Sequence, residues 1–236
     1  MRAAGKVVAD AMEAMRRSVR PGVTTAELDA IAGRVFQQAG ARSGPQLDYD
    51  FPGVTCISVN DEAVHGIPGK RKLSDGDLVK LDVTAELNGF YADACISVPV
   101  GKARKDTMRL VGAAQAALAD GMKAARAGAP LNAIGTAVDA TVTAHGASVC
   151  RELIGHGIGR RIHEPPDVPN FRVPDLIEPL TAGLVLTIEP IISAGSGWVR
   201  DAGDGWTMRT SDGATSAHVE HTMVITKGDP ILLTVA

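Results

Sequence analysis

The sequence predicts an α+β domain built from two related halves, and three observations support this prediction. Two helical segments recur along the chain at one constant offset, and each contains a glycine break and ends at a glycine. β-like sequence follows each helical pair. An Asn-Gly dipeptide lies in the middle of a stretch in which apolar and polar residues alternate. It predicts a long β-hairpin that follows the first helical segment in the sequence and precedes the second.

Length and composition favour one domain. A chain of 236 residues is long for one domain and short for two, and no Pro/Gly/Ser-rich linker divides it. We therefore expect a single domain over residues 1–236, with halves at roughly 1–100 and 105–236. Hydrophobic residues make up 45% of the chain but aromatic residues only 3%, so the core must consist mainly of Ala, Val, Ile and Leu.

Charge and cysteine content exclude several function classes. A net charge of −3 argues against a nucleic-acid or membrane-surface role, and no apolar run is long enough for a signal peptide or a membrane span. The cysteines, Cys56, Cys95 and Cys150, are odd in number and form no CxxC pair. This pattern is typical of reduced thiols, and we expect a cytoplasmic protein.

The helical repeat relates residues 9–41 to residues 115–147. Gly22 and Gly40 in the first copy coincide with Gly128 and Gly146 in the second. Alanine-rich helices align easily by chance. The glycines shared between the helices and at their ends are therefore better evidence for a repeat than the other identical residues. β-like segments follow at 54–60 and 78–98 in the first half, and at 184–192 and 216–226 in the second.

The segment 78–98 predicts a hairpin that places two aspartates side by side. With Asn88-Gly89 as a type I′ loop, Thr84 faces Asp93, and Asp82 shares their side of the sheet. The Cα atoms of the two aspartates would be roughly 7–8 Å apart. They could be two solvated acids on an exposed face, but apolar residues surround them on both strands. A buried pair of like charges requires a compensating charge.

Two further acids, Glu189 and Glu220, lie in equally apolar β sequence. Each alone could be an edge residue pointing at water. Together with Asp82, Asp93 and one histidine they form a ligand set whose four negative charges would balance two divalent cations. Oxygen-rich ligation suits Mn²⁺, Fe²⁺ or Co²⁺ better than a structural zinc, although Zn²⁺ stays possible. A pair of such ions is a hydrolytic centre.

The segment "LIGHGIGRRIHEPP" places His156 and His163 seven residues apart among glycines. Glycine disfavours a local helix, so the two imidazoles could come from a strand and a loop that meet at one place. A lone histidine is more often a satisfied surface or core residue. Reading "GHGIG" as a phosphate-binding loop fails, because the segment lacks GxGxxG spacing and a P-loop lysine.

Five blocks together resemble type I methionine aminopeptidases: "CISVNDEAVHGIP", "KLDVTAELNGFYADAC", "GHGIGRRIHEPP", "LTIEPII" and "HVEHTMVIT". The resemblance covers nearly the whole chain. It implies the pita-bread (creatinase/aminopeptidase) fold, with two pseudo-symmetric halves around a central antiparallel sheet. No large helical insertion interrupts the second half, which favours type I over type II. The family usually has several residues ahead of the segment matching "MRAAGKVV", where this sequence begins.

By that resemblance, Asp82 serves one metal ion, and His156 with Glu189 serves the other. Asp93 and Glu220 would bridge both ions. Glu189 would also move the proton of the attacking water.

The resemblance also assigns substrate contacts. His65 and His163 match the family's two histidines beside the metals, and His163 would hydrogen-bond the scissile carbonyl. Trp206 matches the aromatic residue of the methionine pocket. Tyr49 and Phe51 fall in the loop that supplies other pocket residues, where the alignment is loose.

The implied activity is that of a methionyl aminopeptidase, a metal-dependent hydrolase that removes N-terminal methionine from nascent chains. A small second residue would be preferred. The expected enzyme is a cytoplasmic monomer with possible transient ribosome contact. Two alternatives stay open: a proline-directed peptidase of the same fold, which commonly carries an extra N-terminal domain, and a non-catalytic relative that serves as a binding protein.

Overall fold

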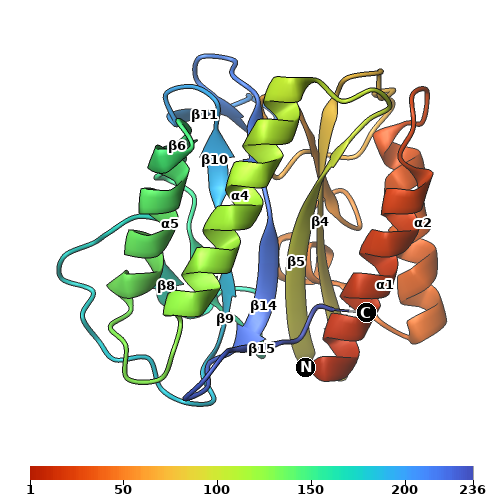
Figure 1. Cartoon of the computed structure of the whole chain (residues 1–236). Helices are drawn as coiled ribbons and strands as arrows, with labels where there is room; N and C mark the ends of the chain where they lie inside the picture. The colour runs from red at the N-terminus through yellow and green to blue at the C-terminus, as the bar shows by residue number, and fades with distance from the viewer. Residues whose placement is uncertain (236) are drawn as a thin grey trace.

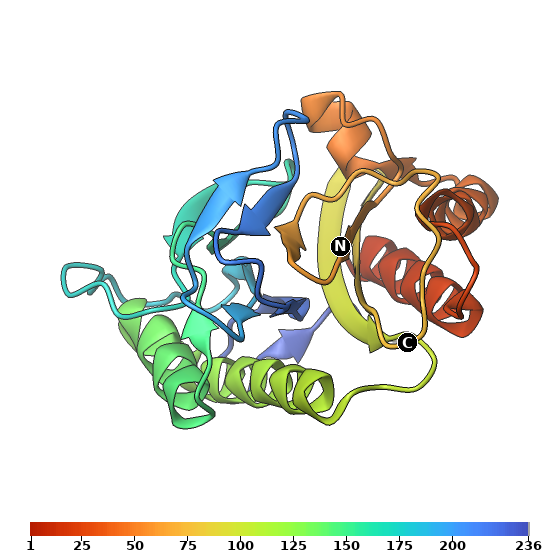
Figure 2. The same cartoon turned by 90° about the horizontal axis from the view of Figure 1, so that it is seen from above.

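Two pairs of long helices cover one face of a curved antiparallel sheet in the computed structural model, which describes residues 1–235 (Figure 1). The view from above in Figure 2 has both pairs on the outside of the curve. The helices are α1 (Arg2–Ser18), α2 (Thr25–Ala39), the short α3 (Gly44–Tyr49), α4 (Lys105–Ala124) and α5 (Asn132–Ala144). This is the expected pita-bread arrangement.

Within the described residues the main sheet has nine strands, with the order β1-β4-β5-β14-β9-β7-β8; β2 pairs with β4 and β15 with β14. All of its pairs are antiparallel. Its strands are β1 (Arg42–Ser43), β2 (Cys56–Val59), β4 (Leu78–Leu87), β5 (Phe90–Pro99), β7 (Gly155–Gly157), β8 (Glu164–Val168), β9 (Val185–Ile188), β14 (Glu220–Val224) and β15 (Ile231–Leu232).

The described residues also form two small sheets of three strands each, with the orders β13-β10-β6 and β11-β12-β3. Their strands are β3 (Glu62–Val64), β6 (Ser148–Val149), β10 (Ile191–Ser193), β11 (Val199–Asp201), β12 (Met208–Thr210) and β13 (Ser216–His218).

The glycines of the sequence repeat occupy matching positions. Gly22 and Gly128 follow the first helix of each pair, and both have φ +90°. Gly40 and Gly146 follow the second helix, with φ +67° and +71°. These left-handed conformations favour glycine, so the shared break and stop reflect the same backbone turns in both halves.

The β4–β5 hairpin has the predicted register. Asn88 and Gly89 form the loop with φ 54° and 80°, as a type I′ turn requires. Thr84 pairs with Asp93, and Asp82 pairs with Cys95. Asp82, Thr84 and Asp93 therefore face one side of the sheet.

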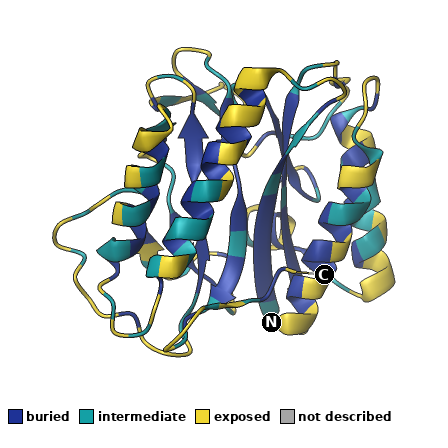
Figure 3. Cartoon of the chain, in the orientation of Figure 1, coloured by how far each residue is buried: buried dark blue, intermediate teal, exposed yellow. Residues whose placement is uncertain are grey.

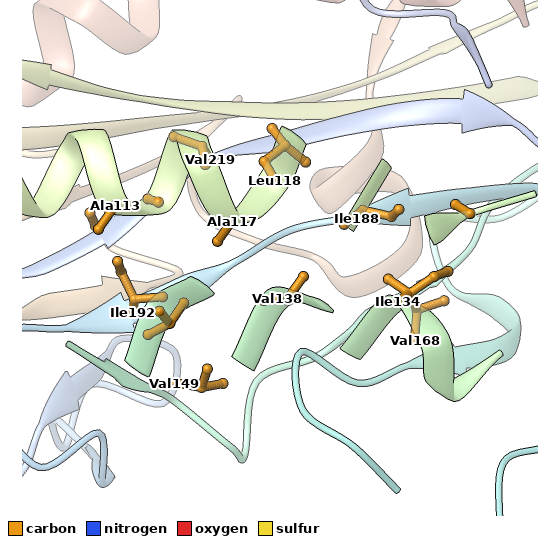
Figure 4. Packing of buried hydrophobic residues seen from close by; sticks show 14 of the residues in the cluster. Ala113, Ala117, Leu118, Ile134, Val138, Val149, Val168, Ile188, Ile192 and Val219 are labelled. Atoms are coloured by element: carbon orange, nitrogen blue, oxygen red, sulfur yellow. The ribbon is translucent and has the colours of Figure 1, made fainter. Parts of the chain in front are cut away.

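The opposite side of the sheet packs against the helices. Leu81, Val83 and Ala94 of the hairpin join Val8 of α1 and Leu28 of α2 in one buried cluster. A second cluster joins α4 and α5 to the strands of the second half (Figure 4). Figure 3 shows the exposed faces of the helices turned away from the sheet. The helices thus seal one face, and the other face is free to line a site.

One strand prediction was wrong in detail. Glu189 was expected inside a strand, but β9 ends at Ile188 and β10 begins only at Ile191. Pro190 has no N–H to donate to a ladder, and here the chain passes from the main sheet into a small one. β13 and β14 are divided in the same way at Val219, so Glu220 is the first residue of β14.

The three cysteines are free and buried. Across the described residues, each helix is too short or too polar to cross a membrane.

We predict that Gly135→Ala destabilises the protein by about 2–3 kcal/mol, although alanine favours helices. A Cβ on Gly135 of α5 would lie 2.3 Å from the Phe171 carbonyl oxygen and 2.4 Å from that of Pro169. Gly112→Ala in α4 is the matched control, because a Cβ there meets nothing within 4 Å. This variant should gain about 0.5–1 kcal/mol. Urea unfolding of both variants checks the prediction, and equal effects would contradict it.

Candidate metal centre

A cavity of about 740 Å³ opens on the side of the sheet away from the four long helices. The four acids singled out from the sequence line it. The hairpin provides Asp82 on β4 and Asp93 on β5, and the sheet-switching segments provide Glu189 and Glu220. Glu220 pairs with Cys95 in the ladder, which brings β14 alongside the hairpin.

The acids lie in an environment that disfavours their charge. Asp93, Glu189 and Glu220 are 6%, 7% and 2% exposed. Loss of solvation raises the pKa of Asp93 to about 6. Desolvation and then the neighbouring carboxylates raise the pKa values of Asp82 and Glu220 well above the usual range. Such a cluster needs cations to be stable in its ionised form.

His156 faces the acids through its Nε2 atom. It lies on β7, and its Nδ1 is 2.9 Å from the Gly157 carbonyl oxygen. Since desolvation lowers the pKa of His156 to about 3, the ring is neutral and Nδ1 carries the proton. The Nε2 lone pair then points into the cluster, 3.5 Å from Glu189 Oε1.

The donor atoms fit divalent cations. Asp93, His156 and Glu220 offer ligand atoms within 4.8 Å of one another, and so do Glu189, His218 and Glu220. Asp82 lines the same cavity but belongs to neither close group. Buried Asp93 Oδ1 and Glu220 Oε1 have no hydrogen-bond partner among residues 1–235. Unpartnered buried oxygens are costly, and a bound cation would satisfy them.

Hydroxyl groups fix the orientation of the ligands. Thr187 donates its hydroxyl to Glu189 Oε1 at 2.8 Å and accepts the backbone N–H of His156 at 3.0 Å. Thr222 links the backbone of β14 to that of Asp93 by two hydrogen bonds of 2.7 and 2.9 Å. The two threonines thus tie together the segments that carry His156, Glu189 and Asp93.

His163 lies on the loop before β8, with its ring centroid 4.2 Å from that of His156. The strand and the loop do bring the two imidazoles together. Tyr49 Oη is 2.5 Å from His163 Nδ1. His65 also faces the cavity, and its φ of 56° is a strained conformation that is common at functional sites.

An apolar wall adjoins the acidic one. Phe51 and Trp206 meet edge to face with their ring centroids 5.1 Å apart. Cys56, Val64 and Ile191 line the cavity with them. The cavity therefore combines an acidic wall with an apolar one.

Sequence reasoning missed His218. This residue ends β13, is 2% exposed and lines the cavity beside Glu220. The available signal was the spacing in "HVE", because residues i and i+2 share one face when the segment is read from the sequence as a single strand.

Comparison with known proteins agrees with this geometry. The model of metallopeptidase family M24 matches residues 1–227. Methionine aminopeptidase 2 of Bacillus subtilis is 44% identical over 232 residues, which are 98% of this chain and 93% of that protein. The crystal structure of methionine aminopeptidase from Thermotoga maritima superimposes with a TM-score of 0.97 at 35% identity, over 100% of this chain and 95% of that one.

A prolidase from Pyrococcus furiosus shares the fold more distantly. It superimposes with a TM-score of 0.80 at 20% identity, and the match covers 100% of this chain but 63% of the prolidase. This likeness concerns the fold alone.

We predict that chelation lowers the melting temperature at neutral pH and that Mn²⁺ or Co²⁺ restores it. An ion at 100 times its Kd contributes about 2.7 kcal/mol, which is at least about 5 °C for a chain of this size. Asp93→Asn should largely lose this response, whereas Asp106→Asn, at an exposed helical position, should keep it. Thermal melts with and without chelator check this, and equal metal responses of the two variants would contradict it.

Proposed function

The chain belongs to metallopeptidase family M24, and we propose that it acts as a methionine aminopeptidase, hydrolysing the peptide bond after an N-terminal methionine. The main support for this proposal is the composition of the cavity. Buried carboxylates and a neutral imidazole lie beside an apolar pocket bounded by Phe51 and Trp206. The names of its relatives support the same activity.

Two divalent cations would be held by Asp82, Asp93, His156, Glu189 and Glu220. When bound, such ions lower the pKa of a water molecule and polarise a carbonyl group. The oxygen-rich donor set favours Mn²⁺, Fe²⁺ or Co²⁺, with Zn²⁺ as a further candidate.

Glu189 is the proposed proton carrier. Burial raises the pKa of its carboxyl well above the usual range, so it can hold a proton and release it again. Thr187 fixes Oε1. Glu189 would take a proton from the attacking water and pass it to the leaving amine.

His163 is the proposed hydrogen-bond donor to the scissile carbonyl. Partial burial lowers the pKa of His163 and raises that of Tyr49, so both are neutral at pH 7. The Tyr49 hydroxyl can then donate to Nδ1, which leaves the proton on Nε2. An N–H aimed at the carbonyl oxygen stabilises the charge that develops there. His65 would contact the amide nitrogen of the substrate.

The substrate's methionine side chain would lie against Phe51 and Trp206, since thioether sulfur packs favourably against aromatic rings. Its free α-amine would lie near Asp82, which excludes internal peptide bonds. A small second residue would be preferred.

We infer that the natural substrates are the N-termini of nascent polypeptides, with transient contact at the ribosome and a monomeric enzyme. A cytoplasmic location is supported by three free, buried thiols. Residues 1–236 would form one catalytic domain.

A peptide assay tests the proposed activity against the proline-directed alternative. With added Mn²⁺ or Co²⁺, we expect cleavage of Met-Ala-Ser to exceed that of an Ala-Pro dipeptide at least about tenfold. Chelator or Asp93→Asn should abolish turnover, because each removes the cation-holding arrangement. Faster cleavage of the proline substrate would favour a prolidase-like enzyme, and absence of any metal-dependent cleavage would favour a binding protein.

We predict that His163→Ala lowers kcat for Met-Ala-Ser about 10²–10³-fold with a small change in KM, because the lost hydrogen bond acts mainly in the transition state. Tyr49→Phe removes the partner of Nδ1 alone and should cause a smaller loss of kcat. Steady-state kinetics on the metal-loaded enzymes measure both effects. A rise in KM with kcat unchanged would assign His163 to substrate binding instead.

A further inference from the structure

His218 is a buried imidazole without a partner. Its side chain is 2% exposed, and neither Nδ1 nor Nε2 has a hydrogen bond within the part of the chain that the structure describes. Leaving a buried polar group unpaired destabilises a fold, so a histidine that serves packing alone would be poorly suited to this position. The ring lines the same cavity as the acids.

The backbone of His218 is fixed from both sides. Its N–H donates to Ser97 Oγ at 3.0 Å, and the Ser97 hydroxyl donates back to the His218 carbonyl oxygen at 2.8 Å. β13 also pairs with β10, where Ile191 lies opposite His218. The imidazole is thus presented to the cavity by a rigid support, as a metal ligand requires.

The distances from His218 to the neighbouring carboxylates are compatible with ligands of one cation. His218 Nε2 lies 3.6 Å from Glu220 Oε2 and 3.7 Å from Glu189 Oε2. These separations are too long for hydrogen bonds. Two donors that hold one cation at about 2.1 Å each must lie within about 4.2 Å of one another, and both pairs satisfy this limit.

His156 approaches the other oxygen of the same carboxylate. Its Nε2 is 3.5 Å from Glu189 Oε1, whereas His218 faces Oε2. The two imidazoles therefore flank Glu189, and the ligand group of Glu189, His218 and Glu220 is distinct from that of Asp93, His156 and Glu220.

We propose that His218 Nε2 is an additional nitrogen ligand of the metal centre, so that the centre holds its cations with two imidazoles. This assignment rests on the metal centre of the proposed function and names one more of its ligands. A second imidazole favours Co²⁺, Fe²⁺ and Zn²⁺ over Mn²⁺, because nitrogen donors suit these ions better. His218 thereby tunes which metal the protein selects.

Proton NMR of the Co²⁺-loaded wild-type protein tests the assignment without a variant. Each imidazole bound through Nε2 contributes one strongly shifted, solvent-exchangeable Nδ1–H signal. We expect two such signals, from His156 and His218. A single signal would overturn the proposal.

His218→Gln identifies the second signal. We expect this variant to lose one shifted signal and to bind Co²⁺ and Zn²⁺ at least about tenfold more weakly by calorimetry, with a smaller loss for Mn²⁺. His221→Gln is the matched control, because His221 also lies near Glu220 but its Nδ1 contacts Thr234 Oγ1 at 2.8 Å. This control should keep both signals, and thermal melts establish that each variant is folded.

The outcomes separate His218 from the metal centre itself. If His218→Gln binds the metal ions more weakly but keeps both shifted Nδ1–H signals, His218 is not a ligand. It would then act only by positioning other groups, and the proposal would be overturned. Equal losses for Co²⁺ and Mn²⁺ would overturn the selectivity. Failure of the wild-type protein to bind any of the three ions would instead refute the metal centre of the proposed function.

Discussion

The convergence of four carboxylates on one cavity, three of them buried and Asp82 partly buried, is the constraint on which the rest of the structure depends. Each of them loses solvation, and the neighbouring carboxylates raise the pKa values of Asp82 and Glu220 further, so the negative charges destabilise one another. A fold retains such a cluster only if something compensates the charge. Asp93 Oδ1 and Glu220 Oε1 lack a hydrogen-bond partner within the described residues, so those residues alone do not provide this compensation.

Each half of the chain contributes two of these four acids. In the first half the β4–β5 hairpin places Asp82 and Asp93 on one face through strand parity. In the second half two strands break and change sheets, next to Glu189 and Glu220. The long helices of both halves pack on the opposite face of the main sheet. The residues on the cavity side are therefore not needed for packing against these helices.

Local rules account for the parts of this site that could be predicted. The hairpin register follows from Asn88-Gly89, and the helix ends follow from glycines that need positive φ. Sheet-switching at Pro190 was missed, because an apolar run containing one proline reads as a single strand. The contact of Tyr49 with His163 joins residues 114 apart, and no local pattern specifies it. His218 was overlooked because a lone histidine is usually a satisfied residue.

The glycines that flank His156 show why these ligands need a special backbone. A Cβ on Gly157 would lie 2.2 Å from the Pro165 carbonyl oxygen, and one on Gly155 would lie 2.8 Å from that of Thr187. β7 is thus closely packed between β8 and β9, and side chains at these two positions would force the strands apart. His156 could then no longer stay within 3.5 Å of Glu189. The sequence GHG is therefore a packing requirement of the metal centre and not a phosphate-binding loop.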